Sequence, residues 1–152
     1  MQLPFTKKQV HEECIRLVDE KIKTAKLAME AAQASANNES KSSAGDKYET
    51  GRAMAQLERD KSAGLLADSE KLKAALQLIQ PEKITYKIQP GSLVITDQGI
   101  FYLAIGLGQI HLEKKPVFVL SPVSPLGSRF LNLEINGTAT FNGNSYMIIK
   151  IL

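Results

Sequence analysis

The chain is short of the residues that mark several classes of protein. Its 152 residues include one cysteine, Cys14, so no internal disulfide can form and a reducing compartment is the natural interpretation. There is no tryptophan, and aromatic residues make up only 6% of the chain. The formal net charge of +3 is too small to indicate nucleic-acid binding by charge alone.

Long hydrophobic runs are missing as well. The N-terminal residues contain no apolar stretch of the kind that a signal peptide carries. The longest apolar run, residues 100–110, is too short to span a bilayer. We therefore expect a cytoplasmic protein with no membrane partner, and we expect it to be a monomer.

The composition changes sharply near Pro81. Before it, alanine, lysine, glutamate, leucine and glutamine dominate, and these residues have high helix propensity. After it, isoleucine, valine, phenylalanine, tyrosine, glycine and proline take over, which is typical of short strands and turns. The sequence predicts an α+β protein with a helical domain over residues 1–80 and a sheet domain over residues 81–152.

The helical domain has the signals of two long helices. Thr6 and Gln9 fit a capping box at the start of the first helix, which we expect to end near Ala36. A second capping pattern covers residues 43–46, and Pro81 predicts an end at Gln80. Neither helix can bury a narrow apolar stripe alone, so we expect an antiparallel coiled-coil hairpin. The expected inward residues are Cys14, Leu17, Val18, Ala25, Ala28, Ala32 and Ser35, facing Met54, Leu57, Leu65, Leu72, Leu76 and Ile79.

The second half alternates between strand and turn signals. Asn142-Gly143 stands between two apolar runs, which is a strong hairpin signal. Residues 125–131 fit one short helix. The sequence predicts a small, mostly antiparallel sheet crossed by that helix, with strands at residues 84–88, 92–96, 100–107, 117–120, 139–141 and 146–152.

The turn between the long helices, residues 37–54, is crowded with charge. A hairpin that only spaces two parts needs no charged tip, so we expect this one to insert into a partner. Asp46 and Glu49 are the candidate functional acids, three residues apart on one helical face. Both also fit a cap or dipole role at a helix N-terminus, and the sequence leaves these alternatives open. The other expected tip contacts are Glu39, Lys41, Ser43, Lys47, Tyr48 and Arg52.

The two halves together resemble the bacterial Gre transcript-cleavage factors. That family joins a long antiparallel hairpin with a charged tip to a small FKBP-like sheet domain with one short helix. Residues 121–131, which read SPVSPLGSRFL, resemble the family segment SP-I/L-G-x-A-L-L-G-K. Residues 91–94 resemble its opening strand and residues 146–152 its closing strand, so the resemblance covers nearly the whole chain.

The resemblance implies a function and a partner. Gre factors insert the hairpin into the secondary channel of RNA polymerase, where tip acids help to hold a second Mg²⁺ and a water, and backtracked RNA is cleaved. The chain itself would hold no cofactor; Mg²⁺ would be shared with the polymerase, and contact with nascent RNA would be indirect. It would not be an enzyme, and at most it would stimulate the polymerase's own cleavage activity. The implied polymerase-binding residues are Ser121, Pro122, Ser124, Pro125, Leu126, Gly127 and Phe130.

The tip departs from the family pattern D-L-S-E-N-A-E-Y. Alignment on Tyr48 matches Ser43 but places Lys41 and Ala44 at the two acidic positions. A lysine near a magnesium site opposes a second cation. A regulator or competitor that lacks cleavage stimulation is therefore the alternative within this family. The Gly-Lys after the family's short helix is also absent here, where Asn132-Leu133 stands.

Two functions of other classes compete with this one. A prolyl isomerase needs a deep aromatic pocket, and the aromatic residues of this chain are scattered along its sequence. A coiled-coil scaffold or adaptor would have a tip with few charged residues and an exposed apolar stripe. His11 and Cys14 lie one turn apart, but a structural metal site needs about four ligands, and no further ligands are apparent nearby.

Overall fold

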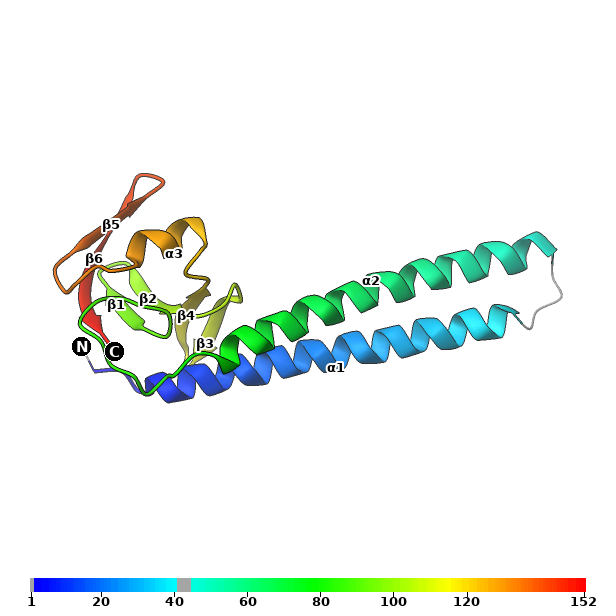
Figure 1. Ribbon diagram of the computed structural model, residues 1–152, viewed down its shortest axis with the longest axis horizontal. Coiled ribbons are helices and arrows are strands. Elements are labelled where there is room, and N and C mark those ends of the chain that lie inside the picture. Colours follow the sequence, from blue (N-terminus) through cyan, green and yellow to red (C-terminus); the bar gives the residue numbers. More distant parts are fainter. Residues whose placement is uncertain (1, 41–44) are drawn as a thin grey trace. The chain divides into compact units, whose positions relative to one another are not determined.

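The computed structural model describes residues 2–40 and 45–152, without the side chains of residues 39–40 and 45–49. Helix α1 covers Lys7–Ser40 and helix α2 covers Gly45–Gln77. By their contacts the residues form two compact units, residues 16–73 and residues 1–15 with 74–152. The first turns of α1 and the last turn of α2 therefore pack with the sheet (Figure 1).

The start of α1 follows the predicted capping box. The Thr6 hydroxyl accepts from the Gln9 backbone N–H at 3.2 Å, and the Gln9 side chain accepts from the Thr6 N–H at 2.8 Å. The helix runs to Ser40, past the expected end near Ala36, because no breaker follows Ala36. Helix α2 ends at Gln77, before the expected Gln80, and the N–H of Leu78 bonds three residues back to Ala75 at 3.3 Å.

Small residues form the seam of the two-helix hairpin in residues 16–73. On α1, Ala25, Ala32 and Ala36 are buried. On α2, the seam contains Ser62 and Ser69, which are 2% and 8% exposed. Their seven-residue spacing is that of a coiled coil, and small side chains let two helices approach closely. The ammonium of Lys73 lies 2.7 Å from the Asp19 carboxylate and links the two helices.

The inward stripe predicted for α2 is wrong over its first half, up to Leu65. Met54, Leu57 and Leu65 are 66%, 69% and 53% exposed, although Leu76 is fully buried. On α1, Ala28 and Ser35 are also exposed. The prediction followed the largest apolar side chains, whereas a closely packed seam selects the smallest ones.

The sheet has six strands in the order β3-β4-β2-β1-β6-β5. All neighbouring pairs are antiparallel except β2 with β4, so the sheet is mostly antiparallel, as expected. After β2 the chain forms outer strand β3 and returns as β4 between them, which makes β4 parallel to β2. The elements are β1 Leu93–Thr96, β2 Gly99–Leu103, β3 Gly108–Leu112, β4 Lys115–Leu120, α3 Pro125–Phe130, β5 Thr138–Phe141 and β6 Asn144–Ile151.

The sheet unit contains the predicted Asn-Gly turn but differs from the sequence prediction in two of its strands. Asn142 and Gly143 have φ of 50° and 78°, as the predicted Asn-Gly hairpin between β5 and β6 requires. The strand predicted over residues 84–88 is absent, and Tyr86 there is 93% exposed. Ile88 is fully buried, and its N–H and C=O bond to Leu133 and Asn132 after α3. Strand β3 was not predicted, because its alternating residues were counted with the apolar run before it.

The two central strands are buried on both faces. Val94, Phe101 and Leu103 face a core that also contains Phe130 of α3. On the neighbouring positions of the same strands, Tyr102 is buried and meets His11 from the first turns of α1. Burial on both faces explains why residues 93–95 and 100–103 read as continuous apolar runs.

The hairpin seam makes a testable prediction about stability. We expect Ala32→Leu to lower the free energy of unfolding by about 1–3 kcal/mol, because extra methylenes do not fit between closely packed helices. Ala28→Leu, the matched change at an exposed position of the same helix, should have little effect. Urea unfolding followed by circular dichroism measures both. Equal losses in the two variants would contradict the seam.

Candidate functional site

The candidate site is built around the segment that leads into α3. Ser124 is the N-cap of this helix, with φ −68° and ψ 159°, and its hydroxyl accepts from the Gly127 N–H at 3.1 Å. The same hydroxyl donates to the Ser121 carbonyl oxygen at 2.6 Å. Pro125 occupies the first helical position, where its missing N–H leaves no bond unmade. The local sequence therefore holds this segment in one conformation.

Gly127 is required at its position by close packing. A Cβ added there would collide with the Ser121 carbonyl oxygen and would lie 2.7 Å from the Ser124 hydroxyl oxygen. Only a residue without a side chain lets the helix turn back over the Ser121 carbonyl. Gly127 is buried, so it affects the site through the path of the backbone and not through contact with a partner.

An apolar cleft of about 280 Å³ lies against this segment. It is bordered by the start of α3, by β4 and by aromatic side chains from separate strands. Phe118 is 38% exposed, so an aromatic surface is open to a partner. The lining residues are Phe101, Gly108, Phe118, Val119, Leu120, Ser124, Pro125, Leu126 and Phe141.

Aromatic rings that are scattered in the sequence meet behind this cleft. The ring of Phe101 stacks on Phe118 with centroids 5.5 Å apart and contacts Phe130 at 5.0 Å. Tyr146 meets Phe101 edge-on, also at 5.5 Å. The interpretation that the aromatics are scattered is therefore wrong for the folded chain. The parallel register that places Phe101 beside Phe118 has no signal in the local sequence.

The predicted binding residues differ in where the fold places them. Ser124, Pro125 and Leu126 line the cleft. Phe130 is fully buried in the core, so its ring offers no surface to a partner, whereas Leu126 is only partly buried. Ser121 and Pro122 are partly exposed in the turn before α3. Phe101, Phe118 and Phe141 line the cleft but were not predicted.

The predicted tip residues lie almost entirely outside the described side chains. This applies to both candidate acids, Asp46 and Glu49. Arg52 is described and lies exposed on α2. The remaining predicted tip contacts, Glu39, Lys41, Ser43, Lys47 and Tyr48, also fall outside the described side chains.

His11 and Cys14 belong to a buried polar cluster with Tyr102. The Nδ1 atom of His11 lies 2.8 Å from the Tyr102 hydroxyl oxygen. Burial lowers the pKa of His11, an effect that Glu12 partly opposes, and favours the neutral imidazole. Burial, with the nearby Glu13 carboxylate, raises the pKa of the Cys14 thiol to about 12, so the thiol stays protonated and unreactive. Among the described residues, no group of three or more His, Cys, Asp or Glu is placed to hold a metal ion.

Comparisons with known proteins give one structural likeness. No family model and no curated protein sequence matches the chain. The structure is similar to the crystal structure of GreA factor homolog 1 (Gfh1) of Thermus thermophilus, over 91% of this chain and 94% of that chain. The sequence identity is 13% and the TM-score is 0.34.

One further feature concerns membranes. Within residues 2–40 and 45–152, neither long helix combines the length and the apolar character that crossing a bilayer requires.

The packing at Gly127 makes a testable prediction. We expect Gly127→Ala to lower the free energy of unfolding by roughly 1–3 kcal/mol, because its Cβ displaces the Ser121 carbonyl or the helix cap. Gly106→Ala is the matched control, since a Cβ there meets no atom within 4 Å. Urea unfolding of the two variants gives the comparison. A Gly127→Ala variant as stable as the control would contradict the described turn.

Proposed function

We propose that the chain is a Gre-like transcription factor that binds RNA polymerase. The observation that carries the proposal is the apolar cleft bordered by Ser124, Pro125 and Leu126. These residues belong to the segment whose sequence resembles the Gre motif, and the partly exposed Phe118 ring adds an aromatic contact beside them. Apolar and aromatic side chains in a preformed recess are the usual centre of a protein interface.

The hairpin would then enter the secondary channel and act on paused or backtracked complexes. Support for this part comes from the two-helix hairpin and the charged sequence of its turn. The factor would act in the cytoplasm as a monomer, would hold no cofactor alone, and would contact nascent RNA only indirectly. It would not be an enzyme, because the catalytic Mg²⁺ belongs to the polymerase.

A scaffold is the second candidate function, and one observation favours it. Met54, Leu57 and Leu65 are spaced along one face of α2 and are more than half exposed. Exposed apolar residues in a row are typical of helices that dock against a partner helix. This face is distinct from the cleft in its residues, so variants separate the two functions.

Binding to core RNA polymerase tests the proposal. We expect the intact chain to retain core polymerase in a pull-down, and a Phe118→Ala/Leu126→Ala variant to bind about tenfold more weakly, since truncation of central apolar contacts typically costs more than 1 kcal/mol. Ile149→Ala removes a side chain of similar exposure that does not line the cleft, and it should bind like the wild type. Urea unfolding confirms that each variant is folded. Binding lost in Leu57→Ser but kept in the cleft variant would favour the scaffold.

Cleavage of backtracked RNA tests the role of the tip. We expect the wild type to stimulate cleavage weakly or not at all, because Lys41 and Ala44 stand at the positions of the family's acids and Lys41 opposes a second cation. We expect a Lys41→Asp/Ala44→Glu variant to gain stimulation while binding stays unchanged.

The existing acids provide the contrary outcome. Strong wild-type cleavage that is lost in Asp46→Asn or Glu49→Gln would make these two residues the functional pair and would contradict the expectation of weak cleavage. Wild-type, Asp46→Asn and Glu49→Gln proteins that all bind without stimulating cleavage would agree with it.

A further inference from the structure

The first turn of α1 carries charge of the sign that its position disfavours. The N-terminus of a helix has a partial positive charge and favours acidic side chains. Here the first two residues are Lys7 and Lys8, and the first turn contains no acid. Lys7 is also only 8% exposed, although lysine is among the residues least often buried. This arrangement needs a physical reason.

Lys7 has an incomplete set of partners. Its ammonium donates to the Lys83 carbonyl oxygen at 2.7 Å, which satisfies one donor of three and does not neutralise the charge. Among the described residues it forms no ion pair with a carboxylate. Burial lowers the pKa of Lys7, because the charged form loses hydration. The ammonium is part-buried, and a cation in that position without a counter-charge loses hydration, so an anion beside it would lower the cost.

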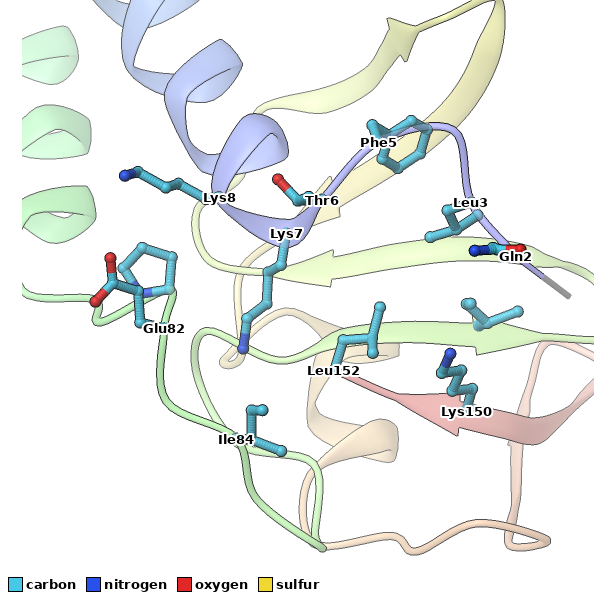
Figure 2. Close-up of a pocket in the computed structure, with 12 residues that line it drawn as sticks. Gln2, Leu3, Phe5, Thr6, Lys7, Lys8, Glu82, Ile84, Lys150 and Leu152 are labelled. Atoms are coloured by element: carbon cyan, nitrogen blue, oxygen red, sulfur yellow. The ribbon is translucent and has the colours of Figure 1, made fainter.

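A pocket of about 470 Å³ lies beside this lysine (Figure 2). Its wall comes from the N-terminal segment and first turn of α1, from residues 81–84 and from the sheet. Among the described side chains that line it, three are basic, Lys7, Lys8 and Lys150, and one is acidic, Glu82. The apolar part of the wall consists of Leu3, Phe5, Pro81, Ile84, Ile95 and Leu152.

We propose that this pocket binds a small amphipathic carboxylate. The carboxylate head would accept hydrogen bonds from the Lys7 ammonium and from the backbone N–H of Lys7 or Lys8, since the N–H groups of Gln9 and Val10 already bond to Thr6. The hydrocarbon body would lie against Phe5, Ile95 and Leu152. A singly charged head would pair with Lys7, the one lysine of the three that is buried. The volume is that of an ordinary small-molecule site.

This site is separate from the proposed polymerase surface. None of its lining residues borders the apolar cleft at α3. The proposal does not rest on the Gre-like function, and the two can fail independently.

Calorimetric titration of the intact chain with decanoate tests the ligand class. We expect decanoate, below its micellar concentration and at low salt, to bind with a stoichiometry of one. We expect 1-decanol, which keeps the chain but loses the charge, to bind at least about tenfold more weakly, because charge-assisted hydrogen bonds are the stronger ones. Acetate, which keeps the charge but loses the chain, should give no measurable heat. Absence of decanoate binding, or equal affinity for decanol, would overturn the proposal.

Lysine variants locate the site. Lys7→Met keeps the apolar stem and should raise the Kd for decanoate at least about tenfold. Lys150→Met, at an exposed position that leaves α1 untouched, should raise it by a smaller factor, so the test stands even if Lys7→Met fails to fold. Lys87→Met is the matched control, an exposed lysine outside the pocket, and should leave the Kd unchanged. An unchanged Kd in Lys150→Met and in a folded Lys7→Met would overturn the assignment.

Discussion

The sheet unit depends on the burial of Phe101. Its ring contacts Phe118, Phe130 and Tyr146, so one side chain joins β2, β4, α3 and β6. Aromatic pairs of this kind are worth about 0.5–1.5 kcal/mol beyond the area they bury. Because α3 is held by Phe130 from below, its first turn can expose Leu126 and Pro125 at the cleft. The proposed polymerase surface thus lies on the exposed side of α3, whose other side packs into the core.

Charge and packing conflict at the other end of this unit. Thr6 and Gln9 cap α1, yet the ammonium of Lys7 bonds to the Lys83 carbonyl oxygen and has no carboxylate partner among the residues that the structure describes. Natural chains tolerate such conflicts mainly at functional sites. A ligand in the pocket beside Lys7 would resolve this conflict, because its anionic head would pair with the Lys7 ammonium.

The candidate site was predictable only in part. The start of a short helix is predictable from Ser124, Pro125 and Gly127. An N-cap, a proline with fixed φ and a glycine at a close backbone approach all depend on neighbouring residues only. Phe118 and Phe141 have no such signal, since their place at the cleft depends on pairings between distant strands. Lys7 reads as an ordinary surface charge in sequence, and only the fold shows it buried.

By itself the sequence determined the two kinds of unit, the capping box at Thr6 and the Asn142-Gly143 hairpin, because propensity, caps and turns act over a few residues. The tertiary structure decided which faces are buried. Ala32 and Ser69 are buried in the seam and Leu57 and Leu65 are not, because two helices can approach closely only where side chains are small. The sequence of one helix does not show which of its faces meets the other helix. The tertiary structure also decided that β4 lies parallel to β2, because strand order follows from where each strand finds an unpaired edge and a covered face.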